Sequence, residues 1–266
     1  MGGSSMSNFW TWYTSPTTGR KYWDLTLCTW VYNRLKSAGM TDNAVCGLLG
    51  NIYQESWICP YKCEGISIVT PSLDYTINTI KSATRAQFIS TTDPAGKYPD
   101  GTGYSLAQWS YSRKGDYWDY NGHSDWDLVG TEYQIYRDTE FLIYDLQRWV
   151  YEPSINENIW SAQGKTVWQW LTDPNVSISD AVNAVLMCYE KPFFHVPPSQ
   201  SEYDTEYNLR YGYARDIMQD LAGLTPPPTP PIPPTPPTPT PTAEIPIWLL
   251  MKLKENQEQK GREYYV

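Results

Sequence analysis

Apolar residues recur at helical spacing near the start of the chain. Leu27, Val31 and Leu35 stand four residues apart, as on one face of a helix. The pattern predicts a helix over residues 25–36. Gly39 is suited to end it, because glycine readily adopts the left-handed backbone conformation that follows many helices.

The next stretch predicts a longer helix. Thr41 and Asp42 can cap its first turn through their side-chain oxygens. The helix is expected to run to about Trp57, with an apolar side made of Val45, Leu48, Leu49 and Ile52.

The pattern then changes twice. From Cys59 to about Asp100 the chain is rich in Pro, Gly, Ser and Thr with short β-branched runs, which is typical of hairpins and loops. Helices are predicted again over residues 132–150, 179–190 and 206–221. The expected fold class is therefore α+β but mostly α: one domain over residues 23–224 with a small irregular or β lobe, preceded by an N-terminal arm over residues 1–22.

A proline-rich stretch ends this domain. Residues 226–242 contain only Pro, Thr and one Ile, so residues 225–242 are expected to form a stiff, extended polyproline II linker. The segment 243–266 that follows has a short apolar patch and a charged tail. It is predicted to be a short C-terminal helix that anchors the chain to a partner protein; the alternative is a frayed terminus.

Composition narrows the possible partners. The formal charge of -9 and the absence of a basic run argue against nucleic acid, which binds clustered Lys and Arg. The 13 Trp and 22 Tyr are rings with a polar edge, which suit sugar-binding surfaces, although many are expected to fill the core. No secretory signal or membrane span is recognisable, since the apolar run 247–251 is far shorter than the ~20 residues a span requires.

The five cysteines suggest no metal site. Cys28, Cys46, Cys59, Cys63 and Cys188 form no zinc-like CxxC pairs, and neither a metal motif nor a phosphate-binding glycine loop is present. No cofactor is expected. Cys59 and Cys63 can form a disulfide in an oxidising environment, but buried free thiols are at least as well supported.

Glu55 is the first candidate for chemistry. It falls in the last turn of the predicted second helix, where the negative end of the helix dipole disfavours a further negative charge. Ile52, Trp57 and Ile58 are placed to desolvate its carboxyl. Both effects favour a protonated acid, although most glutamates near helix ends are ordinary solvated residues.

Three segments in order give Glu55 more weight. The segments WVYNRLKSAGMTDNAVCGLLGNIYQESWICP, GYSLAQWSYSR and VLMCYEKP together resemble the phage tail lysozyme family, over roughly residues 30–221. The resemblance implies a lysozyme-like fold and an enzyme carried on the virion that opens peptidoglycan during infection. It places the catalytic acid at Glu55, before Ser56.

The second segment matches the family at Tyr104, Leu106, Gln108, Trp109 and Arg113. Ser105 and Ser110 stand where the family usually has Gly and Thr. Glycine allows backbone angles that Ser105 adopts less easily, so this wall of the cleft is expected to differ in shape from the family's. As the opposite lip of a sugar cleft, the segment is expected to bind substrate through four residues, Tyr104, Ser105, Gln108 and Trp109. Core packing is an equal alternative for Trp109, and Arg113 is expected to pair with a structural carboxylate. Glu190 lies in a segment that resembles a family motif. It can equally be the buried structural carboxylate that pairs with an arginine such as Arg113.

The resemblance implies cleavage of the β-1,4 bond between N-acetylmuramic acid and N-acetylglucosamine. Protonated Glu55 would donate to the bridging oxygen. A hydrolase usually has a second carboxylate, for which Glu64, Asp74, Asp93 and Asp100 are candidates. Without one, the muramic acid's own hydroxyl can attack, and the enzyme is a lytic transglycosylase.

Two rival classes remain. A Cys/His peptidase would use Cys46 with His123 or His195, but Cys46 lies on the apolar part of a helix, where a buried thiol is expected. A non-catalytic tail module would keep the lysozyme shape and only bind wall glycan or tail subunits. The expected partners are peptidoglycan glycan strands and, through the C-terminal segment, other phage tail proteins; the expected location is the virion tail.

Overall fold

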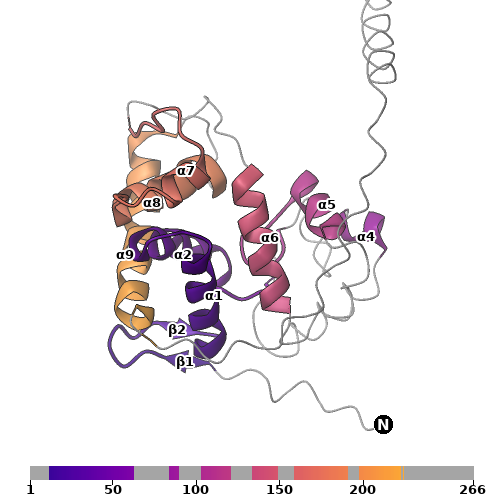
Figure 1. Ribbon diagram of the computed structural model, residues 1–266, viewed down its shortest axis with the longest axis horizontal. Coiled ribbons are helices and arrows are strands. Elements are labelled where there is room, and N and C mark those ends of the chain that lie inside the picture. The colour runs from indigo at the N-terminus through magenta and orange to yellow at the C-terminus, as the bar shows by residue number, and fades with distance from the viewer. Residues whose placement is uncertain are drawn as a thin grey trace, which may run out of the picture. The chain divides into compact units, whose positions relative to one another are not determined.

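The computed structural model describes residues 12–62, 84–89, 103–120, 134–148, 159–190, 198–222 and 224 (Figure 1). Its contacts divide the chain into two units, Met1–Thr229 and Pro230–Val266, and every described residue belongs to the first. The predicted linker over residues 225–242 and the anchoring segment 243–266 lie outside the described residues. So do most of the irregular stretch and both histidines.

The described part is mostly helical, as predicted. The helices are α1 (Leu25–Ser37), α2 (Asp42–Ser56), α4 (Arg85–Ile89), α5 (Tyr111–Asp119), α6 (Gln134–Arg148), α7 (Val167–Leu171), α8 (Ile178–Val185), the π-helix η3 (Leu186–Glu190) and α9 (Gln200–Leu221). The five predicted helical ranges correspond to α1, α2, α6, α8 with η3, and α9. Three short helices, α4, α5 and α7, were not predicted, and α4 lies inside the stretch expected to hold only hairpins and loops.

The ends of the first two helices follow the sequence signals. Gly39 adopts φ 103 after α1, as its suitability for a C-terminal cap predicted. Thr41 caps α2, since its hydroxyl accepts a hydrogen bond from the amide of Ala44 at 3.2 Å. The four apolar residues assigned to the buried side of α2, namely Val45, Leu48, Leu49 and Ile52, are all fully buried.

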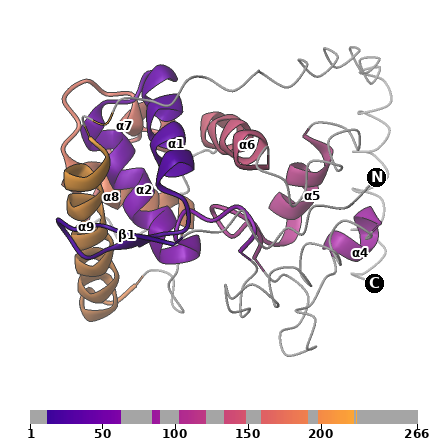
Figure 2. The same cartoon turned by 90° about the horizontal axis from the view of Figure 1, so that it is seen from below.

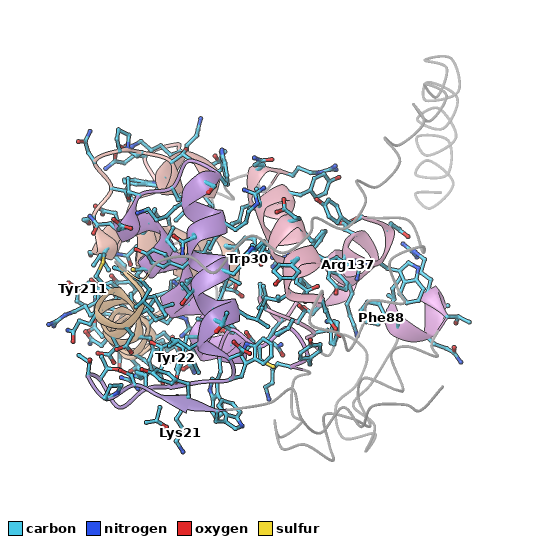
Figure 3. The ribbon with its side chains drawn as sticks, turned by 60° about the horizontal axis from the view of Figure 1, so that its bottom comes forward. Lys21, Tyr22, Trp30, Phe88, Arg137 and Tyr211 are labelled. Atoms are coloured by element: carbon cyan, nitrogen blue, oxygen red, sulfur yellow. The ribbon has the colours of Figure 1, made fainter. Side chains whose placement is uncertain are left out.

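Helix α2 lies at the centre of one half of the core. It packs against α1, α8 and α9, and Figures 1 and 2 show α9 and α6 on opposite sides of the α1–α2 pair. The other half of the core is aromatic and lies between α4, α5 and α6. There Phe88, Tyr104, Trp109, Tyr117 and Phe141 are buried in mutual ring contact, and Figure 3 marks Phe88 on α4.

The N-terminal part of the described chain is a hairpin. Strands β1 (Tyr13–Thr14) and β2 (Lys21–Tyr22) pair antiparallel, with Tyr13 opposite Tyr22. Tyr22 is buried while Lys21 faces solvent (Figure 3). Residues 13–22 thus belong to the folded body, which begins before residue 23. The expected strand-containing lobe after α2 lies mostly outside the described residues.

Three side chains fasten this hairpin to α9. The hydroxyls of Ser15, Thr18 and Tyr22 donate hydrogen bonds to the carboxylate of Asp220, at 2.5, 2.6 and 2.8 Å respectively. Arg20 adds an ion pair with Asp216. Both ends of the described chain are therefore joined through the last two turns of α9.

No described helix is long and apolar enough to cross a membrane.

Candidate active site

Glu55 is the penultimate residue of α2, and its side chain is 23% exposed. The next residue, Ser56, is buried and joins the helix end to the second motif. Its hydroxyl donates to the carbonyl of Leu106 at 2.7 Å. The structure therefore brings the GNIYQES and GYSLAQW segments together, as the resemblance implied.

The Gly-Asn pair of the first motif explains how the helices approach Glu55. A Cβ atom at Gly50 would lie 2.6 Å from the carbonyl oxygen of Arg210 and 2.8 Å from the Cβ of Ala214, so only glycine lets α9 pack this closely on α2. Asn51 donates to the carbonyl oxygens of Gly47 at 2.9 Å and Val182 at 3.3 Å, which ties α2 to α8. The motif thus sets the positions of both neighbouring helices.

The close approach of α9 gives Glu55 an ion-pair partner that the sequence reasoning missed. Arg210 is 1% exposed, and its Nη2 lies 2.6 Å from Oε1 of Glu55. It also pairs with Glu206 one turn earlier on α9. A guanidinium at this distance favours the ionised carboxylate. This effect opposes those of the helix dipole and of the apolar neighbours, which were expected to favour the protonated form.

The apolar surroundings of Glu55 differ from expectation in one residue. Ile52 and Ile58 are fully buried, whereas Trp57 is 43% exposed. Trp57 is therefore not part of the buried apolar surroundings that were predicted around the carboxyl.

Glu190, at the end of η3, has the protonated character that was expected of Glu55. Burial and, after it, the negative charge of Glu55 together raise the pKa of its carboxyl to about 8, against the opposing effects of Arg113 and Arg210. Its Oε1 is shielded from solvent and has no hydrogen-bond donor among the described residues. The site therefore contains one carboxyl paired with an arginine, Glu55, and one buried carboxyl whose pKa is raised, Glu190. The structure also places Glu190 in a π-helix, a distortion frequent at functional sites.

The second motif forms a tight loop. The backbones of Tyr104 and Trp109 exchange hydrogen bonds of 3.1 and 2.9 Å, and the residues between them make the turn. Ser105 takes φ 69 and Gln108 takes φ 45. The left-handed conformation of Ser105 explains why glycine suits this position, as the departure from the family pattern indicated. The hydroxyl of Ser105 is buried and donates to Asp138.

The four residues predicted to bind substrate are placed unequally. Tyr104, Ser105 and Trp109 are buried, so neither predicted stacking ring has an open face in this structure. Gln108 is partly buried; its Nε2 donates to the carbonyls of Lys62 at 3.0 Å and Ser105 at 2.7 Å, while its Oε1 has no donor among the described residues. Substrate contact by this segment stays a prediction, and Gln108 is its best-placed member.

Arg113 pairs with a structural carboxylate, as expected. Its Nη2 lies 2.7 Å from Oδ2 of Asp145 on α6. The same oxygen accepts from the hydroxyl of Tyr189 at 2.7 Å and from Nε1 of Trp109 at 3.2 Å. The indole of Trp109 is therefore part of a buried polar network. This is the core packing that the sequence offered as the alternative to sugar stacking.

Among the described residues, Cys46 does not have the reactive character that the rival Cys/His peptidase would need. Cys28, Cys46, Cys59 and Cys188 are buried free thiols, and burial raises the pKa of Cys46 to about 12, which leaves it unreactive at neutral pH. His123, His195 and Cys63 lie outside the described residues. Within the described ranges no group of His, Cys, Asp or Glu side chains is placed to hold a metal ion.

The four carboxylates proposed as a second catalytic group, Glu64, Asp74, Asp93 and Asp100, also lie outside the described residues.

Comparison with known proteins gives one family. A family model described as phage tail lysozyme matches residues 29–221, which run from α1 to the end of α9 and include Glu55, Glu190 and Arg210. No curated protein matches the chain.

Proposed function

Because the chain belongs to the phage tail lysozyme family, we propose that it is a muramidase of the virion tail. It cleaves the β-1,4 bond between N-acetylmuramic acid and N-acetylglucosamine and thereby opens the cell wall during infection. One observation carries this proposal. Glu55 presents a partly exposed carboxyl at the point where the two motifs meet.

Glu55 acts as the general acid. It donates a proton to the oxygen that joins the two sugars, and the bond breaks through an oxocarbenium-like state. Arg210 favours the ionised form of Glu55, so it stabilises the carboxylate that remains once the proton has left. Glu190 keeps its own proton at neutral pH and adds no second negative charge beside it.

The reaction is completed by water in a muramidase and by the muramic acid's hydroxyl in a lytic transglycosylase. Mass spectrometry of the released muropeptides separates them. Reducing ends support hydrolysis, whereas anhydro ends replace the muramidase proposal with a transglycosylase of the same fold.

The catalytic role is tested by incubating the purified full chain with peptidoglycan sacculi, wild type beside Glu55→Gln. The glutamine keeps the size of the side chain but carries no transferable proton, so we expect muropeptide release to fall at least about 100-fold. Glu140→Gln is the matched control, because Glu140 also pairs with an arginine of another helix, Arg34 at 2.5 Å, but lies in no predicted site. Its release should equal wild type.

Two outcomes contradict the proposal. No release from the wild-type chain would leave a non-catalytic module that binds the wall. Equal release from Glu55→Gln would remove Glu55 from the mechanism.

The tail location rests on the family and on the C-terminal segments. We propose that residues 225–242 hold the domain away from an anchor over residues 243–266, which binds other tail proteins. Deletion of residues 225–266 should leave peptidoglycan cleavage intact and abolish incorporation into particles. Normal packaging of the truncated chain would overturn the anchor.

A further inference from the structure

Two tryptophans meet at the surface immediately beyond Glu55. Trp57 is 43% exposed and Trp12 is 39% exposed, although 45 positions separate them in the chain. Their rings meet edge to face, with centroids 5.2 Å apart and an angle of 76° between the planes. A tryptophan is among the costlier side chains to leave in water, so a pair of them at this place calls for a reason.

The backbone at Trp57 is unfavourable for the residues it carries. Trp57 has φ 59 and Ile58 has φ 60, a left-handed conformation that favours glycine and is rare for a β-branched residue. Three hydrogen bonds hold this turn: the amide of Trp57 donates to Tyr53 at 2.9 Å, the amide of Cys59 donates to Ser56 at 3.0 Å, and Nε1 of Trp23 donates to Ile58.

The strained turn sends consecutive side chains in opposite directions. Ile58 enters the core, where it is fully buried, and Trp57 stays in solvent. Glycine at position 57 would relieve the backbone and cost no core contact. Keeping a large exposed ring there indicates that the ring itself has a use.

Trp12 is held beside Trp57 by the hairpin. It directly precedes β1, and the hydroxyl of Tyr53, on the last turns of α2, donates to the carbonyl of Lys21 on β2 at 2.9 Å. The hairpin is fixed in turn to Asp220 of α9. Both rings therefore sit on anchored backbone, and each keeps more than a third of its surface open.

From this geometry we infer that Trp57 and Trp12 form a glycan-stacking subsite next to Glu55. A pyranose ring has an apolar C–H face that packs on an indole, and an uncharged contact suits a chain whose net charge is -9. The subsite takes a sugar of the same strand that Glu55 cleaves, so the inference rests on the proposed function for the identity of the glycan.

The test measures binding separately from cleavage. Full-length chains that all carry Glu55→Gln are sedimented with peptidoglycan sacculi, so that the substrate is not consumed. Adding Trp57→Gly should weaken binding about tenfold, the upper range for the loss of one aromatic contact. Trp57→Phe, which keeps a stacking face, should stay within about threefold of the reference, and Trp12→Ala should fall between them.

Thermal unfolding distinguishes a binding role from a structural one. Trp57→Gly removes backbone strain, so its thermal midpoint should equal or exceed that of the reference. Gln163→Gly is the matched control, because Gln163 is an exposed residue at φ 54 with no ring to lose. Its thermal midpoint should rise by a similar amount, about 2 °C, and it should bind sacculi as the reference does.

Equal sedimentation of Trp57→Gly and the reference chain overturns the inference, and so does weaker binding accompanied by a lower thermal midpoint. Muropeptide release by the wild-type chain is measured separately. A wild-type chain that binds sacculi but releases nothing contradicts the enzymatic proposal, while sedimentation still decides the role of Trp57.

Discussion

Arg113 and Arg210 each pair with a carboxylate of another helix, and their surroundings are opposite in kind. Asp145, the partner of Arg113, accepts hydrogen bonds from Arg113, Tyr189 and Trp109 on one oxygen. Around Arg210 the bonding is incomplete. Its Nε has no acceptor and Oε1 of Glu190 has no donor among the described residues, and Glu55 is open to solvent on one side.

The difference is the one expected between a structural network and the functional site that we propose. A buried polar group without a partner costs free energy, so the Asp145 network is organised for stability. The Arg210 cluster retains unused donors and acceptors at the place where the two motifs meet. Buried polar atoms without a partner are uncommon in folded proteins, and a catalytic role is one of their recognised explanations. The comparison predicts that substitutions in the first network change stability, and that those in the second change activity.

Glu55→Gln should give the largest effect, a loss of at least about 100-fold in muropeptide release. The free energy of unfolding should change by no more than about 1 kcal/mol, because Glu206 still pairs with Arg210. Release assays on sacculi and urea titrations measure the two quantities. A large loss of stability would place Glu55 in the structural class and break the comparison.

Asp145→Asn should have the opposite effect, a large loss of stability with little loss of activity. Removing the charge opposite the buried Arg113 is expected to cost about 3 kcal/mol of unfolding free energy. Cleavage per folded molecule should stay near wild type. Urea denaturation followed by circular dichroism gives the first value, and release normalised to the folded fraction gives the second. Full stability with lost activity would show that the Asp145 network belongs to the active site.

Glu190→Gln should change how stability depends on pH. The pKa of Glu190 in the folded chain, about 8, lies above the value of 4.5 expected without burial, so the folded state holds the proton more tightly. Its contribution is fully present below pH 4.5 and is lost as pH rises to about 8, with a slope of at most about 1.4 kcal/mol per pH unit. Thermal midpoints between pH 4.5 and 8 should fall less steeply in the variant. Identical slopes would mean that Glu190 is ionised at neutral pH.

Tyr189→Phe should give the smallest effect. It removes the hydrogen bond that Tyr189 donates to Asp145 and the one it accepts from Trp109, while Glu190 is unaltered, at a cost of about 1 kcal/mol. Muropeptide release should be unchanged. A loss of activity larger than the loss of stability would mean that the network orients Glu190, and the two regions would then be coupled.

Local signals in the sequence were enough for the main helices. Thr41 and Gly39 marked real helix ends, and the apolar spacing of α2 identified its buried side. The start of α9 at Gln200 was missed although Ser199 and Glu202 form a capping box that can be read in the sequence. Helix α5 was missed because it is polar and contains a glycine, so it has no apolar stripe to read.

The candidate site was only half predictable. The motif containing Glu55 was recognised, but its pairing with Arg210 joins residues 155 positions apart. Only the close packing of α9 on Gly50 creates that contact. The burial of Tyr104 and Trp109 likewise depends on α5 and α6, which close around the second motif. Neither outcome is encoded in a local pattern.

The bonds between the hairpin and Asp220 have a mechanical consequence. A pull on the chain after residue 222 enters the domain at the C-terminal end of α9, two residues beyond Asp220. There the load meets Asp220, which accepts hydrogen bonds from the hydroxyls of Ser15, Thr18 and Tyr22. Arg210 lies ten residues further in. The bonds of the hairpin to Asp220 therefore lie between the point where such a pull enters and the turn of α9 that carries Arg210.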